Sequence, residues 1–402
     1  MRAVVFTLGC KVNEAESASI MAALEQMGWE TDDKLSYADA YILNTCAVTR
    51  EAEKKSRQLI ARAKKFNEKA QIFVCGCASE KDRKSFEERG VTFVTGARRK
   101  QEIIDAFAAH YGTPVTKMPF PKQTKTRAFI KIQDGCNNFC SYCIIPYLRG
   151  RETSRPIDDI LTEINSISSP EIVLNGINIS SFEGGLEKLM EAIKGVDKRI
   201  RLGSLECSAI TDSLLTALKG LKDFAPQFHL SLQSGSDGVL KAMNRHYTRA
   251  EYLEKCAKIY EYFPDAAITC DIIAGFAIET EEDFENSLSI IDEAGFARIH
   301  AFAYSPREGT TAYKLKDIPP EIKKDRLKRL IAAGKISERK YISRFLGSIR
   351  EIIAEEVEDG YTTGYTDNYI RVYVKEKLTA GRKYRVKLIE LFKDGVLAVN
   401  EG

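Results

Sequence analysis

The chain has 402 residues, of which 44% are hydrophobic and 29% are charged. This is the composition of a soluble protein with a sizeable core, and the length favours two or three domains. The net charge of +3 is too small to indicate a partner by itself. The amino terminus lacks a signal-peptide pattern, and no apolar run approaches the ~20 residues that cross a bilayer. We therefore expect a cytoplasmic protein without membrane contact. In that compartment, spaced cysteines such as those among the ten of this chain more often bind metal or act in catalysis than form disulfides.

Residues 1–116 are predicted to form an N-terminal α/β domain. Its expected strands are 3–8, 40–43, 72–74 and 91–95, and its expected helices are 13–28, 48–66 and 100–110. Strands that alternate with helices favour a parallel sheet with helices on both faces. The polar segment 112–125 contains three prolines and is predicted to be a linker.

Residues 117–340 repeat the alternation of strands and helices. The expected strands are 128–133, 171–174, 199–205, 227–232, 267–273 and 298–304, with helices at 157–167, 186–193, 212–222, 249–261 and 281–293. Six strand–helix steps indicate a TIM-like (β/α) barrel or partial barrel of parallel strands. A helix at 320–345 closes this region. Residues 341–402 contain five short β-type runs, which predict a small antiparallel β-barrel.

Three cysteines follow the first strand of the predicted barrel: Cys136, Cys140 and Cys143. A tight loop with these spacings can direct three thiolates at one point. Zinc and closed iron–sulfur sites take four protein ligands, whereas three cysteines leave one iron of a four-iron cluster open. An open iron can bind S-adenosylmethionine, which one electron then cleaves to a 5′-deoxyadenosyl radical. The pattern CxxxCxxC with Tyr142 before the last cysteine resembles the signature of radical S-adenosylmethionine (SAM) enzymes; the alternative is a zinc knuckle or buried thiols.

A second triplet is expected from the N-terminal domain. Cys10, Cys46 and Cys77 each follow a predicted strand and precede a helix. The carboxyl ends of parallel strands face one crevice, so these thiols can meet and hold a second cluster with one open iron. Cys75 is an alternative to Cys77; we prefer Cys77 because it lies beyond the strand and after Gly76, which can turn the chain.

With both triplets in place, the whole chain resembles the methylthiotransferase family of radical SAM enzymes. The opening Thr-Leu-Gly-Cys-Lys-Val-Asn at 7–13 is similar to the MtaB branch, which acts on tRNA. Further similarity lies at 44–49, 76–77, 134–136, 149–156, 229–235 and 304–307. Ala277-Ile278 and Glu308 depart from the family pattern, in which Pro-Gly and Pro are usual, and neither departure touches a predicted cluster ligand.

The resemblance implies an N-terminal cluster-binding domain, a radical SAM barrel and a C-terminal TRAM domain that binds RNA. It also implies two [4Fe–4S] clusters, SAM, and an electron donor such as flavodoxin or ferredoxin. The implied reaction places a methylthio group on C2 of N6-threonylcarbamoyladenosine beside the anticodon of tRNA. Alternatives within the class are N6-isopentenyladenosine or a ribosomal-protein aspartate as substrate. An alternative of another class is a non-catalytic iron–sulfur protein that binds RNA.

Residues around the two triplets are candidates for binding cofactor and RNA. Catalytic groups of such barrels gather at the carboxyl ends of the strands. The residues that we expect to contact SAM are Tyr142, Gly176, Asn178, Glu206, Gln233 and Ser234. Aromatic and basic residues that alternate on a small barrel suit RNA stacking and phosphate contact. The residues that we expect to contact RNA are Arg149, Arg151, Arg307, Tyr369 and Arg371.

Overall fold

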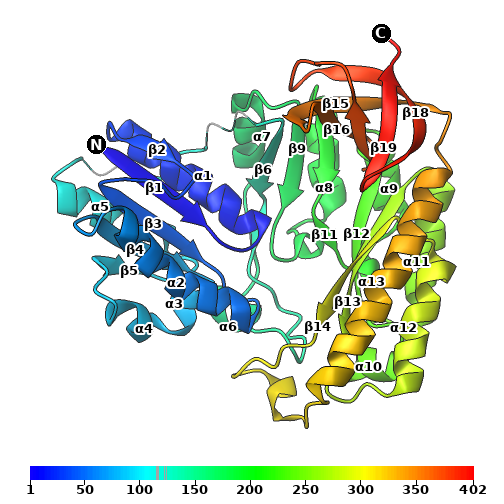
Figure 1. Ribbon diagram of the computed structural model, residues 1–402, viewed down its shortest axis with the longest axis horizontal. Coiled ribbons are helices and arrows are strands. Elements are labelled where there is room, and N and C mark those ends of the chain that lie inside the picture. Colours follow the sequence, from blue (N-terminus) through cyan, green and yellow to red (C-terminus); the bar gives the residue numbers. More distant parts are fainter. Residues whose placement is uncertain (115–116, 122, 124) are drawn as a thin grey trace.

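The computed structural model describes the chain from 1 to 402 except residues 115, 116, 122 and 124. The predicted boundary between residues 116 and 117 therefore lies at the edge of the described residues, and part of the predicted linker lies outside them. In Figure 1 the N-terminal unit and the central unit lie side by side, and the C-terminal strands pack at one end of the central unit. No helix of the described segments is long and apolar enough to cross a bilayer.

The N-terminal unit contains a five-stranded parallel sheet with the order β2-β1-β3-β4-β5. Its strands are β1 (Arg2–Thr7), β2 (Glu30–Asp32), β3 (Ala40–Thr45), β4 (Gln71–Gly76) and β5 (Phe93–Val94). All four neighbouring pairs are parallel, as predicted. The edge strand β2 was not expected, because its sequence Glu-Thr-Asp carries no apolar run.

Helices cover both faces of this sheet. Apolar residues of α1 (Lys11–Gln26) and α5 (Lys100–Tyr111) pack on one face. Apolar residues of α2 (Arg50–Phe66), α3 (Cys77–Lys81) and α4 (Arg83–Glu87) pack on the other. Three residues separate β1 from α1, and α3 begins directly after β4. The turns between strand and helix are therefore short, and they lie together at the carboxyl edge of the sheet.

The central unit is a partial barrel of parallel strands. A three-stranded sheet has the order β10-β9-β6, and a four-stranded sheet has the order β11-β12-β13-β14. The strands are β6 (Arg127–Lys131), β9 (Glu171–Asn175), β10 (Arg199–Leu202), β11 (Ser204–Leu205), β12 (Gln227–Gln233), β13 (Ala267–Ala274) and β14 (Arg298–Ala303). Only Gly203 separates β10 from β11, and no pairing joins the described residues of β6 and β14. The barrel is therefore open on one side.

The helices of the central unit pack outside its strands around one large apolar cluster. The predicted helices are α7 (Ile157–Ser166), α8 (Leu186–Ile193), α9 (Asp212–Lys219), α11 (Arg249–Tyr262), α12 (Glu281–Ala294) and α13 (Pro320–Ser343). Two short helices, α6 (Ile145–Arg149) and α10 (Asp237–Ala242), were not expected. A short antiparallel pair, β7 (Gln133–Asp134) and β8 (Thr153–Ser154), frames the segment that carries the predicted cysteine loop.

The five β-type runs of the C-terminal region form a closed barrel with the order β15-β16-β17-β19-β18. The strands are β15 (Ile349–Glu358), β16 (Tyr361–Thr366), β17 (Arg371–Val374), β18 (Lys383–Phe392) and β19 (Gly395–Asn400). One pair, β17 with β19, is parallel, and the other pairs are antiparallel. Tyr341 and Ile342 of α13 pack into the barrel core, so the division at 340/341, which remains a prediction, falls within a continuous helix.

Stacked aromatic and basic side chains join the C-terminal barrel to the central strands. The guanidinium of Arg127 lies 4.7 Å from the ring centre of Tyr365, and that of Arg201 lies 4.8 Å from the ring centre of Tyr369. Arg127 also forms an ion pair of 2.7 Å with Glu355. The ring of Tyr369, which we expected to stack on RNA, is half-buried and packs against Arg201 and Tyr365 at this junction, which weakens its candidacy as an RNA contact.

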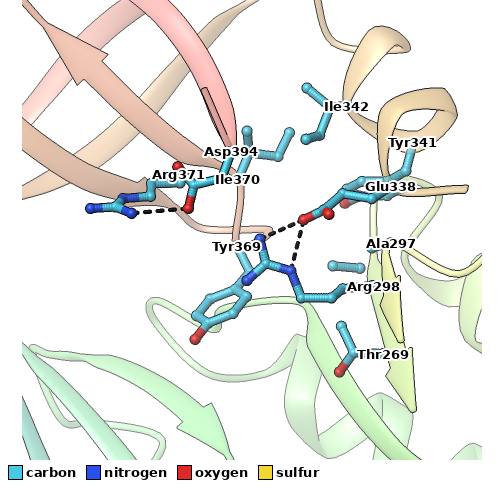
Figure 2. Close-up of a pocket in the computed structure, with 11 residues that line it drawn as sticks. Thr269, Ala297, Arg298, Glu338, Tyr341, Ile342, Tyr369, Ile370, Arg371 and Asp394 are labelled. Atoms are coloured by element: carbon cyan, nitrogen blue, oxygen red, sulfur yellow. Dashed lines mark hydrogen bonds and ion pairs between the residues drawn. The ribbon is translucent and has the colours of Figure 1, made fainter. Parts of the chain in front are cut away.

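Figure 2 shows the narrow pocket beside this junction. Its walls come from the amino ends of β13 and β14, from α13 and from the loop before β17. Arg298 pairs with Glu338, and Arg371 pairs with Asp394 at 2.9 Å and also with Glu358. Two carboxylates therefore neutralise Arg371, which weakens its candidacy as an RNA contact. The pocket lies away from the carboxyl ends of the strands, where the catalytic groups of such barrels gather.

Replacing Tyr369 with alanine should lower the thermal stability of the whole chain. Tyr369 has φ 68°, a conformation that alanine and tyrosine adopt at similar cost, so the substitution reports the lost side chain. We expect the free energy of unfolding to fall by about 1–2 kcal/mol, measured by calorimetry. An unchanged melting temperature would show that the ring does not hold the barrel in place.

Candidate iron–sulfur centres

The three N-terminal cysteines lie at the adjacent carboxyl ends of β1, β3 and β4. Cys10 is the residue before α1, Cys46 follows β3, and Cys77 is the first residue of α3. Asn13 links two of these strand ends, because its side-chain amide donates to the carbonyls of Leu8 and Thr45 at 2.8 and 3.1 Å. The amino end of α1 also favours negative charge near Cys10.

Two glycines allow these strand ends to approach. Gly9 has φ 114°, and a Cβ atom there would lie 3.0 Å from both Cβ and Sγ of Cys46. Gly76 has φ 111°, and a Cβ atom there would lie 2.3 Å from the carbonyl oxygen of Thr45. Side chains at either position would force the cysteine-bearing turns apart.

The environment of the N-terminal thiols couples them electrostatically. The pKa of Cys46 is raised to about 11, chiefly by burial and also by the nearby Cys77 and Cys10, while a backbone hydrogen bond from Val48 and the charge of Arg149 oppose the rise. Burial also raises the pKa of Cys77, against the charge and hydrogen bond of Arg149. Thiols that disfavour one another's ionisation need a cation among them to become ligands. Arg149 provides positive charge there, and a bound metal cluster would provide more.

Cys75 lies apart from this group. It is completely buried in the apolar core between the sheet, α1 and α5, and its thiol interacts with Lys100. Alternation along β4 directs its side chain to the face opposite that of Val74. The geometry therefore favours Cys77 over Cys75 as the third ligand.

Arg149 at the end of α6 reaches from the central unit into the N-terminal unit. Its guanidinium donates to Glu16 and Asp134 at 3.0 Å and to the Asn13 side chain at 2.7 Å, and the residue is 0% exposed. The prediction that Arg149 contacts RNA is wrong, because these partners occupy it inside the protein. Sequence spacing gave no sign of this role, since the partners lie 15 to 136 residues away.

Glu16 is the anionic centre of this interface. Lys100 and Lys131 lie 3.4 and 2.9 Å from its carboxylate, in addition to Arg149. Burial opposes its ionisation, but these three cations hold the pKa of Glu16 well below its usual range. Glu16 therefore remains charged, and its charge lets the cations stay buried between the two units.

The three cysteines of the central loop also gather in one place. Cys140 is buried, and Cys136 and Cys143 are half-buried. The pKa of Cys143 is raised to about 12, chiefly by burial and also by the neighbouring Cys140 and Cys136, against a backbone hydrogen bond from Ile145. The backbone amide of Asn138 donates to Sγ of Cys136 at 3.4 Å, so the loop itself offers hydrogen bonds to a thiolate.

Arg245 contacts this loop, and the sequence did not predict this contact. Its guanidinium donates to Sγ of Cys140 at 3.3 Å and to the carboxylate of Glu206. The side-chain amide of Asn138 also donates to Glu206, at 3.3 Å. Glu206, predicted to bind SAM, therefore lies beside the loop but already has protein partners. A lone arginine after α10 has no spacing relation to the cysteines, so no sequence signal identified it.

The other residues predicted to contact SAM lie at the carboxyl ends of the strands, and one of them is fully buried. Gly176 and Asn178 follow β9 next to Gln133, whose side chain accepts from the Asn178 amide at 2.8 Å. Tyr142 and Gln233 are half-buried at the same ends of the strands. The prediction for Ser234 is wrong: its side chain is 0% exposed, and its hydroxyl bonds to Ser287 of α12.

Two predicted RNA contacts remain near the cysteines. Arg151 is exposed, and its guanidinium lies 4.7 Å from the ring centre of Phe139 in the cysteine loop. Arg307 is buried and donates to the carbonyl of Ala47, beside Cys46, and to Glu53. Both therefore stay predictions, at positions next to the two thiol groups.

The donor sets consist of thiols, which are the usual ligands of iron–sulfur clusters. Within the described part of the chain, no three His, Cys, Asp or Glu side chains lie close enough to share one metal ion, as a zinc site with bonds of ~2.3 Å requires. A four-iron cluster is larger and holds its thiolates further apart. Each triplet would supply three ligands and leave one iron position open.

The sequence matches two families of known proteins. Residues 2–96 match the uncharacterized protein family UPF0004, and residues 130–291 match the Radical SAM superfamily. The fold and the cysteine loop thus define a radical SAM protein, a class that implies SAM and a [4Fe–4S] cluster.

Relatives with curated names narrow the class. The chain is 38% identical to the threonylcarbamoyladenosine tRNA methylthiotransferase MtaB of Chlamydia pneumoniae, over 91% of this chain and 89% of that protein. It is 35% identical to MtaB of Bacillus subtilis (strain 168), over 97% and 94%. It is 34% identical to the tRNA-2-methylthio-N(6)-dimethylallyladenosine synthase of Thermotoga petrophila, over 96% and 94%. The chain belongs to the methylthiotransferase family of radical SAM enzymes.

Solved structures support the fold alone. The radical SAM methyltransferase TsrM from Kitasatospora setae superposes with a TM-score of 0.56 at 12% identity, over 76% of each chain. The cobalamin-dependent radical SAM enzyme OxsB gives a TM-score of 0.53 at 10% identity, over 85% of this chain and 56% of that chain. These values agree with an α/β domain joined to a radical SAM barrel.

Replacing Arg149 with methionine should destabilise the interface between the two units. The substitution leaves Glu16 and Asp134 buried with fewer cations, which we expect to cost about 3 kcal/mol of unfolding free energy. It also removes the cation from Cys77, so iron content after reconstitution should fall. Calorimetry and iron analysis measure the two effects, and Arg151→Met on the exposed neighbour is the control. Equal stability and equal iron in the two variants would contradict this role.

Proposed function

We propose that this enzyme converts N6-threonylcarbamoyladenosine beside the anticodon of tRNA into its 2-methylthio derivative. The observation that carries the proposal is the convergence of two cysteine triplets on one interface. Arg149 lies near both: its positive charge lowers the pKa of Cys77, and its guanidinium donates to Asp134, two residues before Cys136. The curated names of the relatives, methylthiotransferases that act on tRNA, support the same activity.

The two triplets have separate proposed roles. Cys136, Cys140 and Cys143 hold the [4Fe–4S] cluster that binds SAM, and Cys10, Cys46 and Cys77 hold a second [4Fe–4S] cluster. When bound, the first supplies a 5′-deoxyadenosyl radical, and the second supplies sulfur from its open iron. Arg245 and Arg149 orient and neutralise one thiolate in each set. The C2–H bond of adenosine is neither acidic nor strongly electrophilic, which is why side-chain acid–base chemistry alone does not suffice.

Lys11 favours the threonylcarbamoyl nucleoside as substrate. It directly follows Cys10, and its ammonium lies 5.9 Å from the ring centre of Phe129 on β6. No described residue forms an ion pair with it, although its neighbours Arg127 and Arg201 have carboxylate partners. An unpaired cation in the first turn of a helix is locally unfavourable. The carboxylate of a threonylcarbamoyl group would neutralise it, whereas an isopentenyl group would not.

The remaining parts of the proposal follow from this reaction. The substrate is tRNA, and the electron for the first cluster comes from a donor such as flavodoxin or ferredoxin in the cytoplasm. Residues 1–116 form the domain of the second cluster, 117–340 the radical SAM domain, and 341–402 a TRAM domain that adds RNA affinity. Gly176, Asn178, Glu206, Gln233 and Tyr142 surround the SAM site in this proposal.

The two clusters should be separable by mutation. Replacing Cys136, Cys140 and Cys143 with alanine should abolish 5′-deoxyadenosine formation, while about half of the iron remains. Replacing Cys10, Cys46 and Cys77 should also leave about half of the iron, with SAM cleavage retained and methylthio transfer lost. Anaerobic reconstitution, iron analysis and chromatography of the products measure these outcomes. Cys75→Ala is the control and should keep all iron; loss of iron in this control alone would refute the choice of Cys77.

Lys11 should determine the preference for the anionic nucleoside. Lys11→Gln should raise KM for tRNA that carries N6-threonylcarbamoyladenosine by about tenfold, because one charge-assisted contact is lost. Lys11→Arg keeps the positive charge, so its KM for this tRNA should lie between those of the wild type and Lys11→Gln. Turnover on tRNA with N6-isopentenyladenosine, measured in parallel, should not fall in Lys11→Gln. Equal KM values for the wild type and Lys11→Gln on the threonylcarbamoyl substrate would assign substrate choice elsewhere.

A further inference from the structure

A second pocket lies between the N-terminal unit and the loop that follows β14. Its volume is about 300 Å³, and its charged lining residues are Arg50, Glu53, Arg57, Lys81, Arg307 and Glu308. Four of these residues are cationic and two are acidic. The mechanism proposed above uses none of its exposed cations.

Arg307 forms the inner wall of this pocket and is not fully satisfied. Its side chain is 3% exposed, and Nη2 donates to the carbonyl of Ala47 and to Glu53. Nε and Nη1 are buried and have no hydrogen-bond partner among the described residues. A buried guanidinium with two free donors is costly, and an oxyanion that accepts from it would remove that cost.

The outer wall supplies positive charge without internal partners. Arg50 and Arg57 are seven residues apart on α2, about two helical turns, so they lie on one face. Neither residue forms an ion pair with any described residue, whereas Glu53 is shared by Lys81 and Arg307. The carboxylates of the pocket therefore leave a surplus of positive charge, and the amino end of α2 adds to it.

We propose that this pocket binds a backbone phosphate of the substrate RNA beside the nucleoside that is modified. Arginine forks suit phosphate oxygens in bidentate geometry. The pocket adjoins Ala47, the residue after Cys46, so a strand anchored there passes next to the N-terminal thiols. Phosphate contacts fix the position of an RNA without reading its sequence. The inference deepens the proposed function and rests on tRNA being the substrate.

The test compares two variants of α2 in the reconstituted enzyme. Arg50→Ser/Arg57→Ser removes the two unpaired cations of the pocket. Arg62→Ser is the control, since Arg62 is exposed on the same helix and points about 140° away from Arg57. Equal melting temperatures and iron contents establish that both variants are folded. The affinity for tRNA is then measured at several salt concentrations, and again with inorganic phosphate in place of chloride at constant ionic strength.

The double variant should bind tRNA about tenfold more weakly than the wild type, and the slope of log affinity against log salt should fall by about one. Arg62→Ser should match the wild type in both. Phosphate should weaken tRNA binding more than chloride in the wild type and equally in the double variant.

Equal tRNA affinity in the double variant and in Arg62→Ser would overturn the inference. If phosphate nevertheless binds the wild type in a calorimetric titration, the pocket takes free phosphate instead of RNA. Absence of wild-type turnover on tRNA would instead refute the proposed function, so the two failures are distinguishable.

Discussion

The buried guanidinium of Arg149 is the contact on which the rest of the arrangement depends. It belongs to the short helix after the radical SAM loop, yet its partners Asn13 and Glu16 lie in the N-terminal unit. A buried cation of this kind is tolerated only with close anions and hydrogen bonds. This electrostatic cluster, together with the bonds from Arg307 to Ala47 and Glu53, holds the N-terminal thiols in position relative to the radical SAM loop.

Much of the fold and both thiol groups could be predicted because local rules agree with the final structure. The alternation of strands and helices predicted the parallel sheet, the partial barrel and the five C-terminal strands. Cys10, Cys46 and Cys77 were found because the carboxyl ends of adjacent parallel strands meet at one edge. Short elements were missed: β2 has three polar residues, and α6 and α10 span only five and six residues, too few for a periodic signal.

The supporting residues could not be predicted, because their roles arise from tertiary contacts. Arg149 and Ser234 are polar residues in family-like motifs, and nothing in the sequence tells that the fold buries them. Arg245 reaches Cys140 across 105 residues. Tyr369 fits the pattern of an RNA-binding barrel, but its ring stacks on the guanidinium of Arg201 in the central unit. Motif spacing identifies cysteines that share a loop or a sheet edge, whereas the groups packed around them are set by contacts between domains.

The central claim is that both thiol groups act together on N6-threonylcarbamoyladenosine in tRNA. Mass spectrometry of digested tRNA from cells that lack this gene tests it most directly. The account predicts that N6-threonylcarbamoyladenosine accumulates, that its 2-methylthio derivative disappears, and that the 2-methylthio derivative of isopentenyladenosine is unchanged. Persistence of 2-methylthio-N6-threonylcarbamoyladenosine together with loss of the isopentenyl derivative would contradict the claim.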